Sequence, residues 1–244
     1  MVTESISIAS ANAEAEPRVS WLPMLVIALA QILMVFNVST LQVSIDGIAT
    51  SFNVPATTIG TAIVTYALVV AGLILLGARV VQRYGSRRVF RLTVLLFGAA
   101  MALMAFSFNM ATALVAQVIA GAAAAALVPT LVVLIAENYR GAQQGKALAW
   151  LGGAQAMGIV LAFLIAGALA TWVGWRSTFA LLAALAAVIY KLSAQFTTAD
   201  VEREFWKSFN DVQLNELIER ALRANHDIRI AVARLREARA LRGE

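Results

Sequence analysis

Uncharged polar side chains interrupt the first long apolar segment of this chain, and their types suit them to bind a small polar molecule. Asn37, Thr40 and Ser44 recur at helical spacing, so they share one face of a helix. Gln117 and Gln155 lie inside later apolar segments. Amides and hydroxyls donate and accept hydrogen bonds without carrying charge. These residues are therefore candidates for the polar wall of a cavity, and the alternative is that they bond neighbouring helices to one another.

The residue types that carry out most covalent and metal chemistry are almost absent. The chain has no cysteine and a single histidine, His226, which excludes disulfides, thiolate nucleophiles and most metal sites built on these residues. No acidic or basic side chain lies in the middle of an apolar segment, where proton relays of membrane proteins are found. We therefore expect no enzyme activity, no cofactor, no metal site and no proton-coupling group within these segments.

The candidate residues must be positioned by helices that cross a membrane. Apolar residues make up 61% of the chain, charged residues make up 14%, and the mean hydropathy is +0.79, values typical of multi-spanning membrane proteins. A bilayer core of ~30 Å requires roughly 20 apolar residues in a helix. Six segments meet this requirement: Leu22–Ser44, Thr57–Val80, Val89–Phe108, Met110–Ala136, Ala147–Val173 and Ser177–Leu192. The expected fold class is an all-α membrane protein with the lipid bilayer as its surroundings.

Basic residues between the segments predict how the chain is inserted. They cluster between the second and third segments and between the fourth and fifth, at Arg79, Arg83, Arg87, Arg88, Arg91, Arg140 and Lys146. By the positive-inside rule these two connections face the cytoplasm, which places residues 1–20 in the cytoplasm as well. The net charge of +5 is thus explained by topology, and we expect no nucleic-acid partner.

The connection from Gly77 to Val89 combines a turn residue with a basic cluster. It reads Gly77-Ala-Arg-Val-Val-Gln-Arg-Tyr-Gly-Ser-Arg-Arg-Val89, and Gly85 permits a tight reversal of the chain. The pattern resembles the cytoplasmic signature of the major facilitator superfamily, in which an acidic residue precedes the glycine turn. The resemblance implies a cytoplasmic gating loop formed by Gly77, Gln82, Arg83, Gly85, Arg87 and Arg88.

Two further segments strengthen this resemblance by their order along the chain. Leu127-Val-Pro129 in the Ala- and Gly-rich fourth segment, and Gly174-Trp-Arg-Ser-Thr-Phe179 before the sixth, resemble the drug-efflux branch of the superfamily. The resemblance covers about Trp21–Leu192, the N-terminal six-helix half of a fold that is normally built from two such halves. It implies transport of a small molecule across a bacterial-type inner membrane by alternating access.

The chain departs from the family pattern mainly where the family carries charge. Asn37 replaces an acidic residue of the first helix, and Gln117 replaces an arginine of the fourth. Gln82 replaces the acidic residue of the loop, and Ala162-Phe163 occupy a Gly-Pro position of the fifth helix. These differences argue against proton-driven antiport and favour a facilitator or a differently coupled carrier.

The composition changes near Ser193. Residues 193–244 contain 18 of the 33 charged side chains, and their apolar residues recur with helical period, which predicts an amphipathic helical hairpin broken near Asn225–Asp227. The order from Phe205-Trp206 to Ala238-Arg239 is similar to the start of mature outer-membrane factors of tripartite efflux pumps. We therefore expect three parts: a cytoplasmic tail (1–20), a membrane domain (21–192) and a polar helical tail (193–244).

Three functions remain open. The first is small-molecule transport by a truncated or fused half-transporter, which requires a second six-helix half or another copy of the chain to complete the cavity. The second is a non-transporting membrane partner of an efflux pump. The third is an inactive product of gene joining. The substrate, the direction of transport and the coupling ion are not encoded in any motif that we identify.

Overall fold

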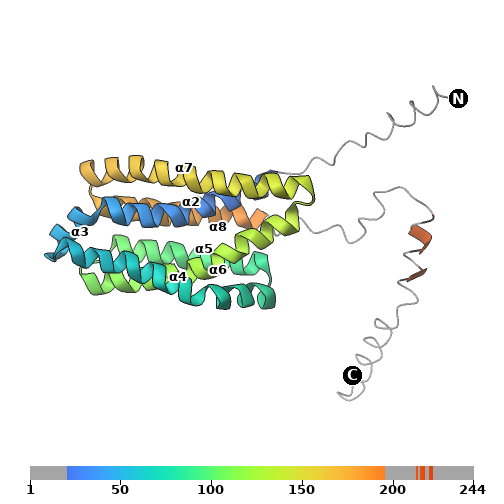
Figure 1. Cartoon of the computed structure of the whole chain (residues 1–244), viewed down its shortest axis with the longest axis horizontal. Helices are drawn as coiled ribbons and strands as arrows, with labels where there is room; N and C mark the ends of the chain where they lie inside the picture. The colour runs from blue at the N-terminus through green and yellow to red at the C-terminus, as the bar shows by residue number, and fades with distance from the viewer. Residues whose placement is uncertain (1–20, 196–212, 214, 218–219, 222–244) are drawn as a thin grey trace, which may run out of the picture. The chain divides into compact units, whose positions relative to one another are not determined.

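The computed structural model describes residues 21–195 and, in the tail, Gln213, Asn215, Glu216, Leu217, Arg220 and Ala221. The first of these ranges folds into long helices that lie side by side along a common direction (Figure 1). They are α2 (Leu22–Val43), α3 (Ile45–Phe52), α4 (Ala56–Tyr84), α5 (Ser86–Ala105), α6 (Met110–Asn138), α7 (Ala142–Trp172) and α8 (Trp175–Gln195). All of them except α3 are long and apolar enough to cross a membrane. The predicted six-helix membrane fold is thereby confirmed.

The helices differ from the predicted segments mainly at their ends. The fifth span was predicted from Ala147 and the sixth from Ser177, but α7 begins at Ala142 and α8 at Trp175. Hydropathy underestimates these helices because their first turns contain polar residues that still adopt helical backbone angles. The short helix α3 was not predicted at all, because Asp46 and Gly47, just after Ser44, end the apolar segment on which the prediction rested.

The expected loop between the second and third spans is almost entirely helical. Gly85 is the only residue between α4 and α5, with φ 83° and ψ 146°. A positive φ of this kind strains any residue that has a Cβ atom, so glycine permits the reversal within one residue. The basic residues of the predicted loop therefore lie on the last turns of α4 and the first turns of α5.

Packing around α6 explains why small residues recur in the sequence. A Cβ atom built on Gly77 of α4 would lie 2.3 Å from the carbonyl oxygen of Ala125 in α6, so only glycine allows this crossing. Pro129 has no N–H group, and the carbonyl that consequently loses its usual helical donor is that of Ala125. The two backbones thus meet at the point where the proline has freed a carbonyl.

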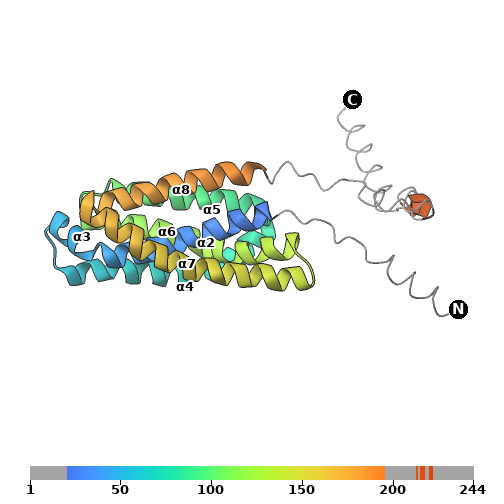
Figure 2. The same cartoon turned by 90° about the horizontal axis from the view of Figure 1, so that it is seen from above.

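The interior of the bundle is formed mainly by α2, α5 and α6. Helix α2 packs against α7 and α8, α6 packs against α4 and α5, and α5 also packs against α8. Figure 2 shows this arrangement from above, with α7 and α8 lying alongside α2. Much of the surface of α4 and α7 remains exposed in this bundle.

The chain divides into two units, one ending at Thr197 and the other beginning at Thr198. The boundary lies close to the predicted change near Ser193. The cytoplasmic tail (1–20), the hairpin break at Asn225–Asp227 and the segment similar to outer-membrane factors fall outside the described residues, apart from the six tail residues named above. These expectations stay predictions.

Candidate functional site

Asn37 and Gln117 are brought together in the interior of the bundle. The Asn37 side chain donates from Nδ2 to Oε1 of Gln117 at 3.1 Å, and Gln117 donates from Nε2 to Oδ1 of Asn37 at 3.5 Å. Both residues have 0% of their surface exposed. The reciprocal bond joins α2 to α6 across 80 residues of sequence. These two candidates therefore bond neighbouring helices, which was one of the two predicted roles.

The other cavity candidates lie in different surroundings. Thr40, on α2, and Ser44, the residue directly after α2, are buried, but their hydroxyl oxygens have no hydrogen-bond partner among the described residues. Gln155 is exposed on α7. Asn37, Gln117, Thr40 and Ser44 are thus buried inside the bundle, whereas Gln155 lies on its exposed surface.

One end of the bundle, which we call the basic end, holds the predicted gating loop. Gln82, Arg83, Gly85, Arg87 and Arg88 are exposed there, whereas Gly77 is buried one turn earlier, against α6. The guanidinium of Arg83 lies 5.7 Å from the ring centre of Tyr84, within the range of a cation–π contact. The arginines are thus presented outward on two consecutive helix ends.

An acidic residue that the sequence analysis did not single out lies at the same end. Ser86 donates from Oγ to Oε2 of Glu137 at 2.6 Å, which links the first turn of α5 to the last turn of α6. A carboxylate at the start of a helix is favoured by the helix dipole. Glu137, at the end of α6, therefore places an acidic side chain near the Gly85 turn. The turn's own position 82 carries the uncharged Gln82 in place of an acid.

Tyr139, at the end of α6, caps the N-terminus of α2. Its hydroxyl oxygen accepts a hydrogen bond from the backbone N–H of Met24 at 3.1 Å, and its ring centre lies 5.6 Å from that of Trp21. The residue preceding α2 makes no capping bond of its own. Burial raises the pKa of Tyr139, and the Met24 bond opposes part of that rise. The hydroxyl is therefore neutral at physiological pH. Local sequence patterns do not reveal a cap of this kind, because Tyr139 and Met24 are 115 positions apart.

The opposite end of the bundle, which contains α3, is held by Trp175 and Arg176. The indole nitrogen of Trp175 donates to Oγ of Ser51 at 2.9 Å, and Arg176 donates from Nη2 to the carbonyl oxygen of Ser107 at 2.9 Å. The guanidinium also lies 4.3 Å from the Trp175 ring centre. The Gly174–Phe179 segment thus ties α3 and the end of α5 to the start of α8.

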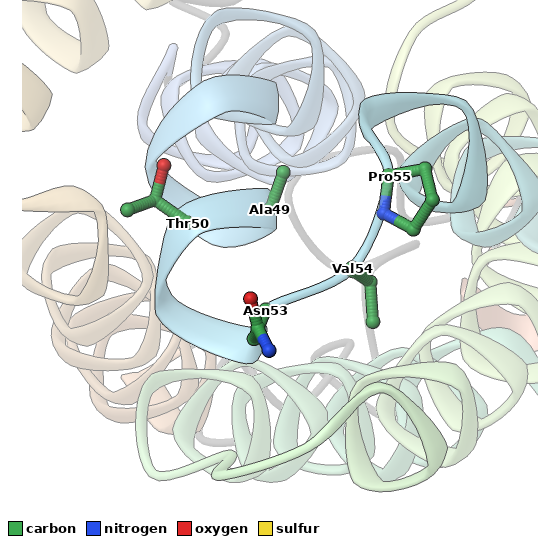
Figure 3. A pocket seen from close by; sticks show the side chains of 5 residues that line it. All are labelled: Ala49, Thr50, Asn53, Val54 and Pro55. Atoms are coloured by element: carbon green, nitrogen blue, oxygen red, sulfur yellow. The ribbon is translucent and has the colours of Figure 1, made fainter.

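A hollow opens beside the connection from α3 to α4. Figure 3 shows its lining, which consists of Ala49, Thr50, Asn53, Val54 and Pro55. Asn53 has a positive φ of 54°, a conformation that asparagine tolerates better than most residues. The hollow is shallow and open to the surroundings, and none of the predicted cavity residues lines it. Within the described residues, no group of three His, Cys, Asp or Glu side chains could hold a metal ion.

Comparison with known families matches the geometry described above. The family described as Major Facilitator Superfamily matches residues 27–222, which include most of α2 and all of the later spans up to α8. The chain belongs to the major facilitator superfamily. It is therefore a multi-pass membrane protein, and the resemblance inferred from the Gly77–Val89 connection is confirmed. The match to the superfamily continues beyond Ser193 into the polar tail.

Several curated members of the superfamily are similar to this chain. The puromycin resistance protein pur8 of Streptomyces alboniger is 30% identical over 162 residues, covering 66% of this chain and 32% of the relative. The lincomycin resistance protein of Streptomyces lincolnensis is 28% identical over 171 residues, covering 70% and 35%. The cephamycin export protein CmcT of Amycolatopsis lactamdurans is 26% identical over 149 residues, covering 61% and 31%. The chain thus spans about a third of the length of these relatives.

Among solved structures, a D-xylose–proton symporter shares the superfamily fold. The TM-score is 0.64 at 17% sequence identity, and the match covers 83% of this chain and 53% of the symporter. At this identity the similarity supports the arrangement of the helices only. Because the match covers 53% of the symporter, the six-helix bundle of this chain corresponds to about half of that protein. The relatives named above are transport and resistance proteins. The three curated ones are bacterial, which is consistent with an inner membrane.

Proposed function

We propose that this chain forms one six-helix half of a carrier that exports small molecules. The observation that carries the proposal is the similarity of its six spans to resistance and export proteins of the major facilitator superfamily. Puromycin and lincomycin appear in the names of two of these relatives and represent the class of antibiotic-like substrate that we propose.

The Asn37–Gln117 pair is the proposed polar contact for such a substrate. One of its two bonds is short, at 3.1 Å, and the other is at the limit of hydrogen bonding, at 3.5 Å. A polar group that both donates and accepts can exchange with the longer bond. The pair therefore offers a donor and an acceptor to the polar groups of a substrate.

The exposed sides of α4 and α7 are the proposed contact with a second six-helix bundle. Only 17% of the most apolar stretch of each helix is buried, and α7 presents Gly152, Gly153 and Ala156 on its exposed surface. Small residues allow close approach of helices in lipid, where burial of apolar surface provides little driving force. The second bundle is either a separate six-helix half or another copy of this chain.

The basic end is proposed to face the cytoplasm. Arg83, Arg87 and Arg88 lie there with Arg140, whereas the opposite end has Arg176 paired to a carbonyl. The excess of arginine at one end is the usual signal for cytoplasmic placement. A cysteine at Arg88 should resist a membrane-impermeant maleimide in intact cells, and one at Asn53 should react. The reverse pattern would contradict this orientation.

Accumulation of a labelled substrate tests the proposed transport. Cells lacking their own drug exporters would express the chain alone, or together with a second six-helix half, and their content of puromycin and of lincomycin would be measured. We expect accumulation to fall at least twofold relative to an empty vector, and the Gln117→Leu variant to lose this effect. The Leu92→Ala variant serves as a control, because Leu92 is 66% exposed on α5.

Unchanged accumulation of both compounds, with the protein demonstrably inserted in the membrane, would contradict the proposal. That result would favour the role of a non-transporting membrane partner.

Cross-linking tests whether the second bundle is another copy. The chain contains no cysteine, so a single introduced thiol reports its own surroundings. We expect Ala156→Cys to form disulfide-linked dimers under mild oxidation in the membrane, and Leu92→Cys on α5 not to do so. Equal cross-linking at both positions would indicate random collision instead of a defined contact.

A further inference from the structure

Negative charge is scarce at the basic end of the bundle. Residues 21–195 contain two acidic side chains, Asp46 and Glu137. Asp46 lies in the first turn of α3 at the opposite end, and Glu137 already accepts a hydrogen bond from the first turn of α5. Three cations of α5 and α8 bond to no carboxylate in the part of the chain that the structure describes, namely Arg88, Arg91 and Lys191. Their positive charge is therefore uncompensated within these residues.

Arg91 and Tyr190 join α5 to α8 near this end. The Arg91 guanidinium lies 5.0 Å from the Tyr190 ring centre, and its Nη2 atom donates to the tyrosine hydroxyl at 3.4 Å. Further along, a Cβ atom on Gly98 would lie 2.7 Å from Cβ of Ala186, so the two packed helices also approach closely there (Figure 2). A guanidinium stacked on a ring can still donate N–H groups in its own plane. Arg91 is thus held in place and can bond an anion such as a phosphate.

The other two cations lie at the ends of exposed apolar stripes. On α5, Arg88, Leu92 and Leu95 recur at helical spacing, and the two leucines are 66% and 52% exposed. On α8, Val188 is 50% exposed and lies three residues before the exposed Lys191. Each helix therefore presents apolar side chains outward, and a positive charge follows them at the basic end.

Helix length places these cations at the edge of the hydrocarbon layer. Arg88 is less than one turn from Arg91 along α5, and Lys191 adjoins Tyr190 on α8. We call the surface formed by these four residues the α5–α8 seam. Helix α5 has 20 residues, so its length of about 30 Å matches the hydrocarbon thickness of a bilayer. Its first turns, which carry the two arginines, therefore lie where the lipid headgroups begin.

We propose that the α5–α8 seam binds the headgroup of an anionic phospholipid. The lipid phosphate accepts hydrogen bonds from Arg91 and attracts the other two cations, while an acyl chain covers the exposed leucines of α5. Basic pockets between transmembrane helices recognise anionic headgroups in this way. An anionic lipid suits the seam better than a zwitterionic one, because the cationic group of a zwitterionic headgroup is repelled by three uncompensated positive charges.

Native mass spectrometry of the purified full-length chain tests the proposal without any transport activity. The chain would be mixed in detergent with equal amounts of phosphatidylglycerol and phosphatidylcholine that carry the same acyl chains. We expect at least threefold more phosphatidylglycerol than phosphatidylcholine on the wild-type chain, and equal amounts on the double variant Arg88→Gln, Lys191→Gln. Both positions are exposed, so these substitutions should leave the fold intact.

The matched control is the double variant Arg79→Gln, Lys146→Gln. It removes the same charge from exposed positions near the same end, but on α4 and α7, and should keep the preference for phosphatidylglycerol. An equal loss in both double variants would indicate diffuse attraction by net charge and overturn the site. Absence of any preference in the wild-type chain overturns the proposal, and displacement of the lipid by inorganic phosphate would show that the seam binds a free anion instead.

Thermal unfolding tests Tyr190 as a positioning residue for Arg91. Phosphatidylglycerol should raise the unfolding midpoint of the wild-type chain more than phosphatidylcholine does. Tyr190→Leu should reduce this difference because the guanidinium loses the ring that orients it, whereas Tyr190→Phe retains the ring and should keep most of the difference. An undiminished difference in Tyr190→Leu would contradict this role. Because neither readout involves a transported substrate, failure of the proposed transport would leave the lipid result standing.

Discussion

Helices α4 and α6 are almost equally apolar, yet the fold uses them in opposite ways. In the most apolar stretch of α6, 56% of the residues are buried inside the bundle, against 17% in α4. The two helices pack against each other, so the difference arises from what covers their other sides. Helix α6 is also covered by α5, whereas much of α4 faces outward. Apolar character in a membrane protein therefore identifies a span without showing whether lipid or protein will cover it.

Matched leucines provide the sharpest test of this contrast. Leu127 of α6 is 0% exposed and Leu68 of α4 is 66% exposed. Leu127→Ala should lower the free energy of unfolding by about 2–5 kcal/mol, because it leaves a cavity in a packed interior. Leu68→Ala should change it by less than about 0.5 kcal/mol, as for other surface sites. Equilibrium unfolding in mixed micelles containing SDS measures both values. Similar losses for the two variants would show that α4 is covered by protein in solution.

Matched glycines test the contact between the same two helices. Gly77→Ala introduces a Cβ atom against the Ala125 carbonyl, whereas Gly72→Ala meets no atom within 4 Å. We expect the first variant to lose about 1–3 kcal/mol through overpacking. The second should be neutral or slightly stabilising, because alanine favours helix more than glycine. Thermal unfolding in detergent compares them. An unaffected Gly77→Ala protein would mean that α4 and α6 separate more easily than the packing indicates.

The amide pair provides a test of coupling between the helices. Asn37→Leu or Gln117→Leu alone leaves a buried amide without its partner and should cost about 1–3 kcal/mol. The double variant should cost less than the sum of the two, by about 0.6 kcal/mol, the average for such bonds in membranes. A double-mutant cycle of unfolding free energies gives this coupling. Strict additivity would show that the pair contributes no net interaction.

The long-range cap of α2 should have the smallest effect. Tyr139→Phe removes the hydroxyl that accepts from Met24 but retains the ring beside Trp21. We expect a loss of about 1 kcal/mol, as for other helix caps. Tyr84→Phe is the control, since Tyr84 is 57% exposed at the same end. Equal thermal unfolding midpoints for the two variants would assign the capping of α2 to groups other than this hydroxyl.

Much of the fold was accessible from the sequence because lipid imposes a simple requirement. Every span must be apolar for about 20 residues and must satisfy its own backbone, so hydropathy located six helices to within several residues. The method failed where polar residues remained helical, as at Ala142, and where one residue interrupts a helix, as at Ser44. Both cases depend on backbone angles that apolar patterns do not encode.

The candidate site was accessible only in part. The shared face of Asn37, Thr40 and Ser44 followed from helical spacing, and the departures from the family pattern drew attention to Asn37 and Gln117. Tyr139 was missed, because its hydroxyl accepts a hydrogen bond from Met24, which lies 115 positions away in the sequence. Gln155 looked equivalent to Gln117 in sequence, yet it lies on an exposed face.

The sequence by itself determined that the chain crosses the membrane six times, that its turns are basic at one end, and that its spans lack ionisable groups. These properties follow from the free energies of transferring side chains from water into the membrane, which depend only on the residues within a short stretch of sequence. Only the tertiary structure decided which polar groups find partners. Asn37 reaches Gln117 because α2 and α6 cross at that level, whereas the hydroxyls of Thr40, Ser44 and Thr178 are buried without a partner among the described residues. Hydrogen bonds form over a few ångströms, so they are set by helix register and crossing, which no window of sequence contains.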